Sequence, residues 1–319
     1  MKKGIQYLAG AVFTSVLVLV LFFLSVIVFP KDVFSSSYQA AIQRKFDYLM
    51  SIEEPKIIII GGSSAGFGIN EEYIEKATGY PVANLGLHAG FGALFPMELS
   101  KANINPGDII ILAPEWGWNN DRYERVGADL IMSGIDSRLD IYRYVCTPQF
   151  LSAFIGYLPT YAEKKSIFTP VGGAIYSISS FDENGRMIVP RPNMTFDYEN
   201  NVDVYGEVWM ESIEMDDTTV SYLTSYREFI ESKGAHVYFA ACPTYKAAVR
   251  SSDENFRKIA ALEEEKTGIP YISDPSDYFF PDEYMFDTIY HCNNAGELHR
   301  SELLVQDLLN AGAFSVVSE

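Results

Sequence analysis

Four consecutive isoleucines, Ile57 to Ile60, lie between Pro55 and the glycine pair Gly61-Gly62. A β-branched run of this kind is typical of a strand buried on both faces, because it leaves no polar side chain to face water. Such strands occur in parallel sheets that carry helices on both sides. The run therefore predicts an α/β protein built around a parallel sheet.

Short apolar segments repeat this pattern along the chain and alternate with stretches of helical periodicity. Further strands are predicted at 81–85, 108–112, 236–241 and 269–273, and helices at 41–50, 71–78, 218–233 and 253–266. Alternating strands and helices imply right-handed crossovers and a layer of helices on each face of the sheet. We therefore predict a three-layer α/β/α, flavodoxin-like domain.

A final helix is predicted near the C-terminus. Asn294 and Glu297 have the spacing of a capping box, in which each side chain bonds the backbone N–H of the other residue. Leu298 and Leu308 belong to an apolar stripe that we expect to pack on the sheet.

The segment from Tyr7 to Phe29 is apolar and carries no charge. As a helix it would be about 34 Å long, enough to cross the roughly 30 Å hydrocarbon core of a bilayer. A cleaved signal peptide is the alternative, but its apolar region is shorter and ends at a small-x-small site. Lys2 and Lys3 favour a cytoplasmic N-terminus. We predict a transmembrane anchor over 1–30, with 7–29 in the lipid bilayer, and an extracytoplasmic domain over 31–319.

Composition excludes several classes of partner. The net charge is −18 and no lysine or arginine cluster follows the anchor, which argues against nucleic acid and anionic lipid as partners. Three cysteines, Cys146, Cys242 and Cys292, are too few for a disulfide framework, although one disulfide with a free thiol remains open. The histidines do not share metal-ligand spacing with acidic residues or cysteines, so no metal site is predicted.

The stretch from about 117 to 217 breaks the alternation of strands and helices and is rich in Tyr, Asn, Asp and Pro. We interpret it as an insertion after the third strand, at the edge of the sheet where ligands of α/β proteins bind, so it would wall the site. Aromatic residues in and before it suit stacking on sugar rings, or they fill a small satellite core. These residues are Trp116, Trp118, Tyr123, Tyr142 and Tyr144.

A glycine-rich turn, 61–68, follows the first predicted strand. It lacks the Gly-x-Gly-x-x-Gly of a dinucleotide site and the lysine of a phosphate loop, and no cofactor is predicted. A nucleophile turn needs a serine held at the end of a strand, and Ser63 and Ser64 are both available. The elbow pattern Gly-x-Ser-x-Gly would select Ser64, but that elbow normally follows several strands. A turn that merely connects strand to helix is the structural alternative.

Asp287 and His291 lie close together near the C-terminus. A serine, an aspartate and a histidine are the components of a nucleophile, an orienting acid and a base. The two residues could instead cap the last helix. Together with the serine turn they favour chemistry on acyl esters.

Three segments, 57–68, 84–90 and 286–296, resemble the SGNH (GDSL) hydrolase superfamily. Within it the chain is most similar to the membrane-anchored cell-envelope branch, which includes teichoic-acid D-alanylation and alginate O-acetylation proteins. The resemblance covers roughly 50–115 and 218–310 and does not extend to the insertion.

The resemblance implies that Ser63 is the nucleophile, that His291 is the base, and that Asp287 holds the imidazole in the correct tautomer. It also implies an oxyanion hole formed by the N–H of Ser63 and an amide of Ala89 or Gly90.

One family motif is missing. Where the third block of the family supplies an Asn donor after the third strand, this chain has Ala113-Pro-Glu-Trp116. Either Trp118, Asn119 or Asn120 replaces that donor, or the hole consists of two amides.

Three residues are predicted to bind substrate, namely Asn84, Glu115 and Trp116. For Glu115 the sequence leaves three alternatives: it orients the substrate, its charge disfavours an oxyanion, or it is a solvated loop residue.

The resemblance implies an extracytoplasmic serine esterase or O-acyltransferase that acts on acyl esters of a cell-envelope glycan or lipid, with no cofactor. The alternative is a catalytically inactive SGNH-fold subunit that binds polysaccharide or an envelope assembly partner.

Overall fold

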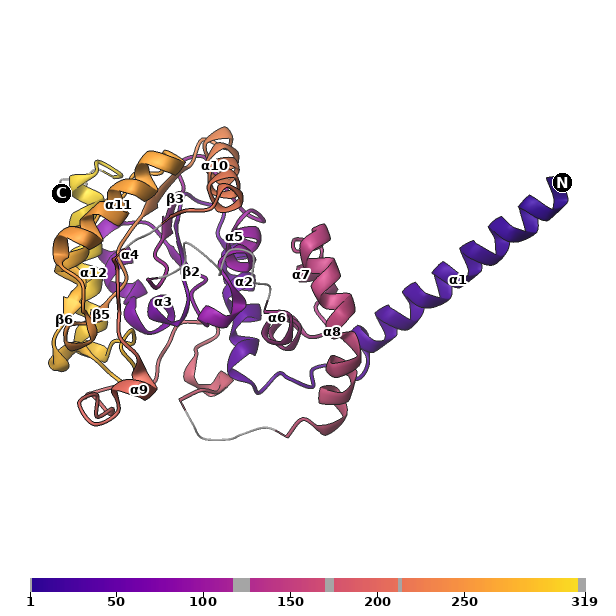
Figure 1. Cartoon of the computed structure of the whole chain (residues 1–319), viewed down its shortest axis with the longest axis horizontal. Helices are drawn as coiled ribbons and strands as arrows, with labels where there is room; N and C mark the ends of the chain where they lie inside the picture. Colours follow the sequence, from indigo (N-terminus) through magenta and orange to yellow (C-terminus); the bar gives the residue numbers. More distant parts are fainter. Residues whose placement is uncertain (1, 117–126, 170–174, 212–213, 315–319) are drawn as a thin grey trace.

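The computed structural model describes residues 2–116, 127–169, 175–211 and 214–314. Its centre is a four-stranded parallel sheet in the order β2-β1-β3-β4 (Figure 1). The strands are β1 (Ile57–Ile60), β2 (Val82–Asn84), β3 (Ile109–Leu112) and β4 (His236–Phe239). The prediction of a mixed α/β protein around a parallel sheet is therefore confirmed.

All four isoleucines of β1 are fully buried, as their sequence predicts. Ile58 and Ile60 belong to one hydrophobic cluster, whereas Ile57 and Ile59 belong to another. Since successive side chains of a strand point to opposite faces, the sheet is buried on both sides.

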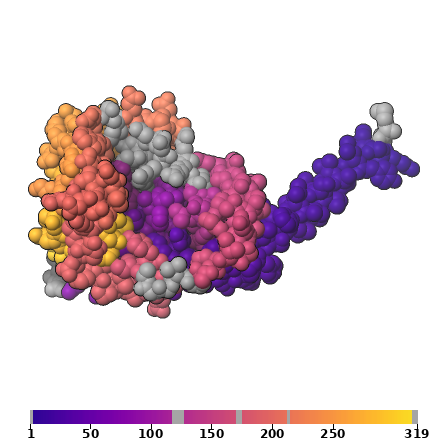
Figure 2. Space-filling view, turned by 60° about the horizontal axis from the view of Figure 1, so that its bottom comes forward, coloured from indigo at the N-terminus to yellow at the C-terminus, as the bar shows by residue number. Residues whose placement is uncertain are grey.

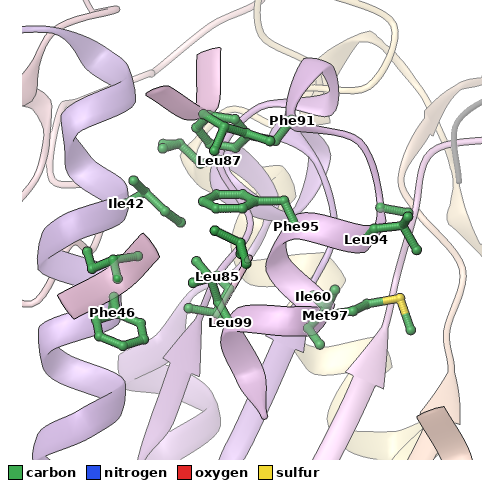
Figure 3. Packing of buried hydrophobic residues seen from close by; sticks show 14 of the residues in the cluster. Ile42, Phe46, Ile60, Leu85, Leu87, Phe91, Leu94, Phe95, Met97 and Leu99 are labelled. Carbon is green, nitrogen blue, oxygen red and sulfur yellow. The ribbon is translucent and has the colours of Figure 1, made fainter. Parts of the chain in front are cut away.

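The first face is covered by α2 (Ala41–Ser51), α5 (Leu94–Ser100) and α10 (Asp217–Ser232). Figure 3 shows Ile42 of α2 directed toward Phe95, and Phe46, Leu85 and Leu99 belong to the same cluster. The same cluster also contains Leu223 and Ile230 of α10.

The second face is covered by α4 (Glu71–Thr78) and α12 (Asn294–Asn310). Ile74, Leu304 and Leu308 supply the buried side chains. A third cluster lies between α11 (Asp253–Thr267) and the short parallel pair β5 (Thr244–Tyr245) and β6 (Phe279–Phe280).

The strand predicted at 269–273 is not formed. Only a single parallel bridge joins Tyr271 to Phe239. In this bridge Phe239 N–H donates to Pro270 O, and Ile272 N–H donates to Phe239 O. Pro270 has no N–H with which to continue the ladder, so the segment lies beside β4 without forming a strand.

The start of α12 differs from the prediction by one residue. Asn293, not Asn294, caps the helix by accepting from Gly296 N–H. Glu297 pairs with buried Arg191 instead of completing a capping box. Leu298 is exposed, so it does not belong to the buried face of the helix.

The insertion contains helices that the sequence did not predict: α6 (Ala128–Ile135), α7 (Leu139–Tyr142), α8 (Pro148–Ile167) and α9 (Val202–Tyr205). Ile131 and Phe154 share the main core with α2, so this part of the insertion is integral to the domain. Gly156 and Pro159 interrupt the apolar periodicity of α8, which explains why the pattern did not indicate a helix.

The N-terminal segment forms α1 (Lys2–Val28), which projects from the domain (Figure 1). Over Lys3–Val28 it is long and apolar enough to cross a membrane, and almost all of its side chains are exposed. At its end, Nζ of Lys165 donates to the carbonyls of Ile27 at 2.6 Å and Pro30 at 2.9 Å and pairs with Asp136 at 3.0 Å. A buried cation therefore joins α8 to the last turn of α1, where the helix dipole is negative.

All three cysteines are unpaired. Cys146 is exposed, whereas Cys242 and Cys292 are buried. Burial raises the pKa of Cys292 to about 12, so this thiol remains protonated and acts as a small packing residue.

A buried ion pair joins the starts of β1 and β3. Asp108 accepts from Nζ of Lys56 at 2.9 Å, from its N–H at 3.0 Å and from Asn105 N–H at 2.8 Å. Both charged side chains are fully buried.

Asp108→Ala should lower the free energy of unfolding by about 3–5 kcal/mol, because it leaves the Lys56 ammonium buried without its counter-ion. Urea unfolding of the full-length protein in detergent measures the loss. The control is Lys258→Ala, which breaks an exposed pair with Glu254 and should change stability by less than about 1 kcal/mol. Equal effects of the two variants would contradict the prediction.

Candidate active site

The candidate site lies at the carboxyl ends of β1 and β3. Chain order reverses between these two strands, because the first connection leads to β2 and the second returns across β1 to β3. Ligands of open α/β sheets bind at such a point. Ser63 follows β1 as the first residue of α3 (Ser63–Gly68), and Glu115 follows β3.

The two neighbouring serines have different environments. Ser64 is 0% exposed and its hydroxyl has no hydrogen-bond partner among the described residues, whereas Ser63 is partly exposed. Ser64 N–H donates to Oε1 of Glu115 at 2.8 Å, and its carbonyl accepts from Nη1 of Arg300 at 2.7 Å. These contacts hold Ser64 inside the protein and leave Ser63 as the serine that faces outward.

Glu115 is 2% exposed, so it is not a solvated loop residue. Its carboxylate lies so close to Gly62 that a Cβ there would be 2.4 Å from both oxygens. Glycine at this position permits the contact between Glu115 and the first turn of α3. Glu115 therefore has a structural role in fixing the serine turn.

Asp287 and His291 are joined by a short hydrogen bond. Nδ1 of His291 and Oδ1 of Asp287 are 2.7 Å apart, in a loop closed by the antiparallel bridge between Met285 and Cys292. The other carboxylate oxygen of Asp287 accepts from the hydroxyl of Tyr176 at 2.5 Å. With Nδ1 held by the carboxylate, Nε2 of His291 is available for proton transfer.

The imidazole of His291 stacks on the ring of Phe67, with centroids 4.2 Å apart and planes at 2°. Phe67 and Ser63 are i+4 and i on α3 and so lie on the same face of this helix. His291 thus lies against the face of α3 that begins with Ser63. The Ser63 hydroxyl forms no hydrogen bond to another residue in the described part of the chain, and such contacts are often loose before substrate binds.

Asp287 is held in its ionised form. Burial acts to raise the pKa of Asp287, but the hydrogen bond and charge of His291, followed by the hydrogen bond from Tyr176, outweigh burial and lower this pKa below its ordinary value of 3.8. The ionised carboxylate can accept the Nδ1–H of His291 and so fix the tautomer of the ring.

The predicted donor Gly90 is already bonded. Its N–H donates to Nδ1 of His88 at 2.9 Å, so in this conformation it is not free for an oxyanion. Ala89 and Ser63 form no backbone N–H bond to the rest of the described chain. Burial lowers the pKa of His88, which keeps its ring neutral with the proton on Nε2.

Asn84 does not line a binding site. It is buried, and its amide donates to Ala65 O at 3.0 Å and Glu71 at 2.9 Å while its oxygen accepts from Gly86 N–H at 2.9 Å. The hydrogen-bonding groups of Asn84 therefore hold the loop after β2.

Trp116 packs edge-on against Phe256, and its Nε1–H donates to Thr244 at 3.0 Å. These contacts favour the satellite-core interpretation over sugar stacking. Tyr142 is buried and Tyr144 packs against Phe46, so neither presents a free ring face for a sugar. Trp118, Asn119, Asn120 and Tyr123 lie outside the described residues.

Sequence reasoning missed two residues of the site, Tyr176 and His88. Tyr176 belongs to the insertion, 111 positions from Asp287, and no local pattern points to it. His88 lies in the loop after β2, within a segment that resembles the family. Its position directly before Ala89 and Gly90, the two predicted oxyanion donors, could have indicated it.

No protein-family model matches the chain, and no curated protein matches its sequence. The described residues contain no group of three His, Cys, Asp or Glu side chains that could hold a metal ion.

Tyr176→Phe should lower the free energy of unfolding by about 1 kcal/mol at neutral pH, because it removes a hydrogen bond to a charged group that is partly exposed. The difference from wild type is present above pH 3.8 and shrinks as the pH falls through the lowered pKa of Asp287, since a protonated carboxyl gains less from the donor. Urea unfolding at a series of pH values measures it.

The matched control is Tyr38→Phe, which removes a bond to the uncharged carbonyl of Leu87. Its effect should not depend on the ionisation of Asp287. A pH-independent effect of Tyr176→Phe would contradict the proposed charge-assisted bond.

Proposed function

We propose that the chain is a membrane-anchored serine esterase or O-acyltransferase with an SGNH-like three-layer α/β/α domain, acting on acyl esters of a cell-envelope glycan or lipid. The observation that carries the proposal is the Asp287–His291 pair stacked on the helix that Ser63 begins. A structural histidine that only caps a helix would not need a partly buried carboxylate on its Nδ1. The cap of α12 is supplied by Asn293 instead.

In this proposal the hydroxyl oxygen of Ser63 attacks the acyl carbonyl while Nε2 of His291 takes its proton. Asp287 stabilises the imidazolium that forms. The attack gives a tetrahedral intermediate. Its bond to the alcohol oxygen then breaks, the alcohol takes the proton from His291, and the acyl group stays on Ser63. Water or a sugar hydroxyl completes the cycle by the same steps, so hydrolysis and transfer use the same residues.

The negative oxygen of the intermediate needs donors, and we assign two of them. One is the N–H of Ser63, at the positive end of α3. The other is Nε2–H of His88, whose tautomer is fixed by Gly90 N–H on Nδ1. His88 would then replace the Asn donor of the family motif.

The proposed location is the outer side of a membrane. The apolar helix α1 anchors the chain, and Lys2 and Lys3 at its N-terminal end favour a cytoplasmic N-terminus.

The second candidate function is a catalytically inactive subunit that binds polysaccharide or an assembly partner. The hydrogen bond that occupies the Gly90 amide favours it, because this bond removes one donor of the expected oxyanion hole.

A fluorophosphonate should add one adduct to the full-length protein in detergent, detected by intact mass. The adduct should be lost in Ser63→Ala and His291→Ala and retained in Ser64→Ala, because the Ser64 side chain is buried. Loss only in Ser64→Ala would move the nucleophile to that residue. A folded wild-type protein without any adduct, tested also with a smaller acylating reagent, would favour the binding subunit.

His88→Phe should slow this labelling by about 100-fold, the loss expected when one oxyanion donor is removed. His88→Gln keeps a side-chain N–H and should lose less. His236→Phe, on the exposed start of β4, is the control and should label at the wild-type rate. Unchanged labelling of His88→Phe would contradict the assignment of His88.

A further inference from the structure

Two adjoining cavities lie beside the candidate site. Their volumes are about 370 Å³ and 360 Å³, within the roughly 300–1,000 Å³ range of small-molecule sites. Both are lined by Ser37, Gln39 and Phe168, so they meet along a shared wall. We call the two together the insertion groove. Its walls combine the segment after the anchor with helices α6 and α8 of the insertion.

One end of the insertion groove reaches the candidate site. The smaller cavity is lined by His88 and Tyr176. Tyr176 donates to Asp287. The ring centroid of Tyr176 is 5.7 Å from that of Phe67, the ring on which His291 stacks. A molecule in this cavity therefore contacts the side chain that holds the acid of the proposed triad.

The other end lies beside the membrane anchor. Lys164 and Ile167, on the last turn of α8, line the larger cavity. The residue between them, Lys165, binds the carbonyl of Ile27 at the end of α1. Figure 2 shows a hollow with violet surface at its bottom and pink surface along one side, and the indigo helix projects beyond that pink surface.

The lining of the insertion groove is mainly apolar and nearly uncharged. Hydroxyl and amide side chains lie between aromatic and aliphatic ones, a surface suited to sugar hydroxyls and the apolar faces of sugar rings. Near the α8 end, Asp129 and Lys164 have opposite signs, and the described lining carries no cluster of cations that would pair with a polyanion. The net charge of −18 also disfavours an anionic chain.

We propose that the insertion groove binds an uncharged polyhydroxyl chain that is linked to the membrane and enters from the α1 side. This inference deepens the proposed function, because it names the substrate class of the same site, and it rests on that function only for the reaction at Ser63. The chain would lie along the groove, with its membrane-linked end near Ile167 and an acylated hydroxyl near Tyr176.

The test uses full-length protein in lipid nanodiscs and three probes: a diacylglycerol lipid with a maltotriosyl head group, free maltotriose, and trigalacturonate. We expect the neutral lipid-linked probe to bind at least about 10-fold more tightly than free maltotriose, because the bilayer raises its local concentration at the groove. Trigalacturonate should bind more weakly than maltotriose. Equal binding of the free and lipid-linked probes would overturn entry from the membrane, and tighter binding of trigalacturonate would overturn the uncharged chain.

Ser133→Trp fills the larger cavity and should weaken binding of the lipid-linked probe by about 10-fold or more. Ser232→Trp is its matched control, because both serine hydroxyls donate to a carbonyl of the preceding helical turn and Ser232 lies on α10, away from the groove. Gln39→Ala removes a shared amide without adding bulk and should weaken binding several-fold, so a failure of Ser133→Trp to fold does not decide the test. Wild-type affinity in Gln39→Ala and in folded Ser133→Trp would overturn the proposal.

Fluorophosphonate labelling separates this inference from the proposed function. Labelling of Ser63 is measured in the wild-type protein beside the binding of the neutral probe, so that the two activities are read separately. Binding of the neutral chain without any labelled serine would support the groove as a binding site and contradict the esterase proposal. Labelling of Ser63 without binding of the neutral chain would support the esterase proposal and overturn the binding inference.

Discussion

Burial of β1 on both faces is the constraint on which the rest of the structure depends. A strand of four isoleucines must have apolar partners above and below, and α2, α5 and α10 supply one side while α4 and α12 supply the other. Because β1 is central, its carboxyl end is surrounded by loops from its neighbours. The serine turn is therefore fixed by the core and does not depend on a mobile surface loop.

The serine turn is also held by two buried charges of opposite sign. Glu115 accepts from the backbone N–H of Ser64, and Arg300 donates to its carbonyl. Both charged side chains are desolvated. The backbone N–H of Ser64 partly compensates Glu115, and the backbone carbonyl of Ser64 partly compensates Arg300. This arrangement fixes the direction of the first turn of α3 and leaves the Ser63 side chain outside the clamp.

The sequence was sufficient for elements with a strong local pattern. The isoleucine run, the helix over 71–78 and the glycine that ends α11 are found where the periodicity and caps predict them. Helix α8 was missed because Gly156 and Pro159 weaken its pattern and its stability comes from packing on the main core. The same reason explains which partners of Asp287 were predicted. His291 is close to Asp287 in sequence and was predicted, whereas Tyr176 is distant in sequence and contacts Asp287 only in the folded chain.

The Lys165 contact has a mechanical consequence under the proposed anchoring of α1 in a bilayer. Because the last carbonyls of α1 are bonded to a side chain of the domain, the helix and the domain tilt together instead of swivelling about a loose joint. The height of the sheet above the lipid head groups is then nearly constant. A protein tethered in this way searches its surroundings by sliding in the plane of the bilayer, and its reach is limited to what lies within one domain diameter of the surface.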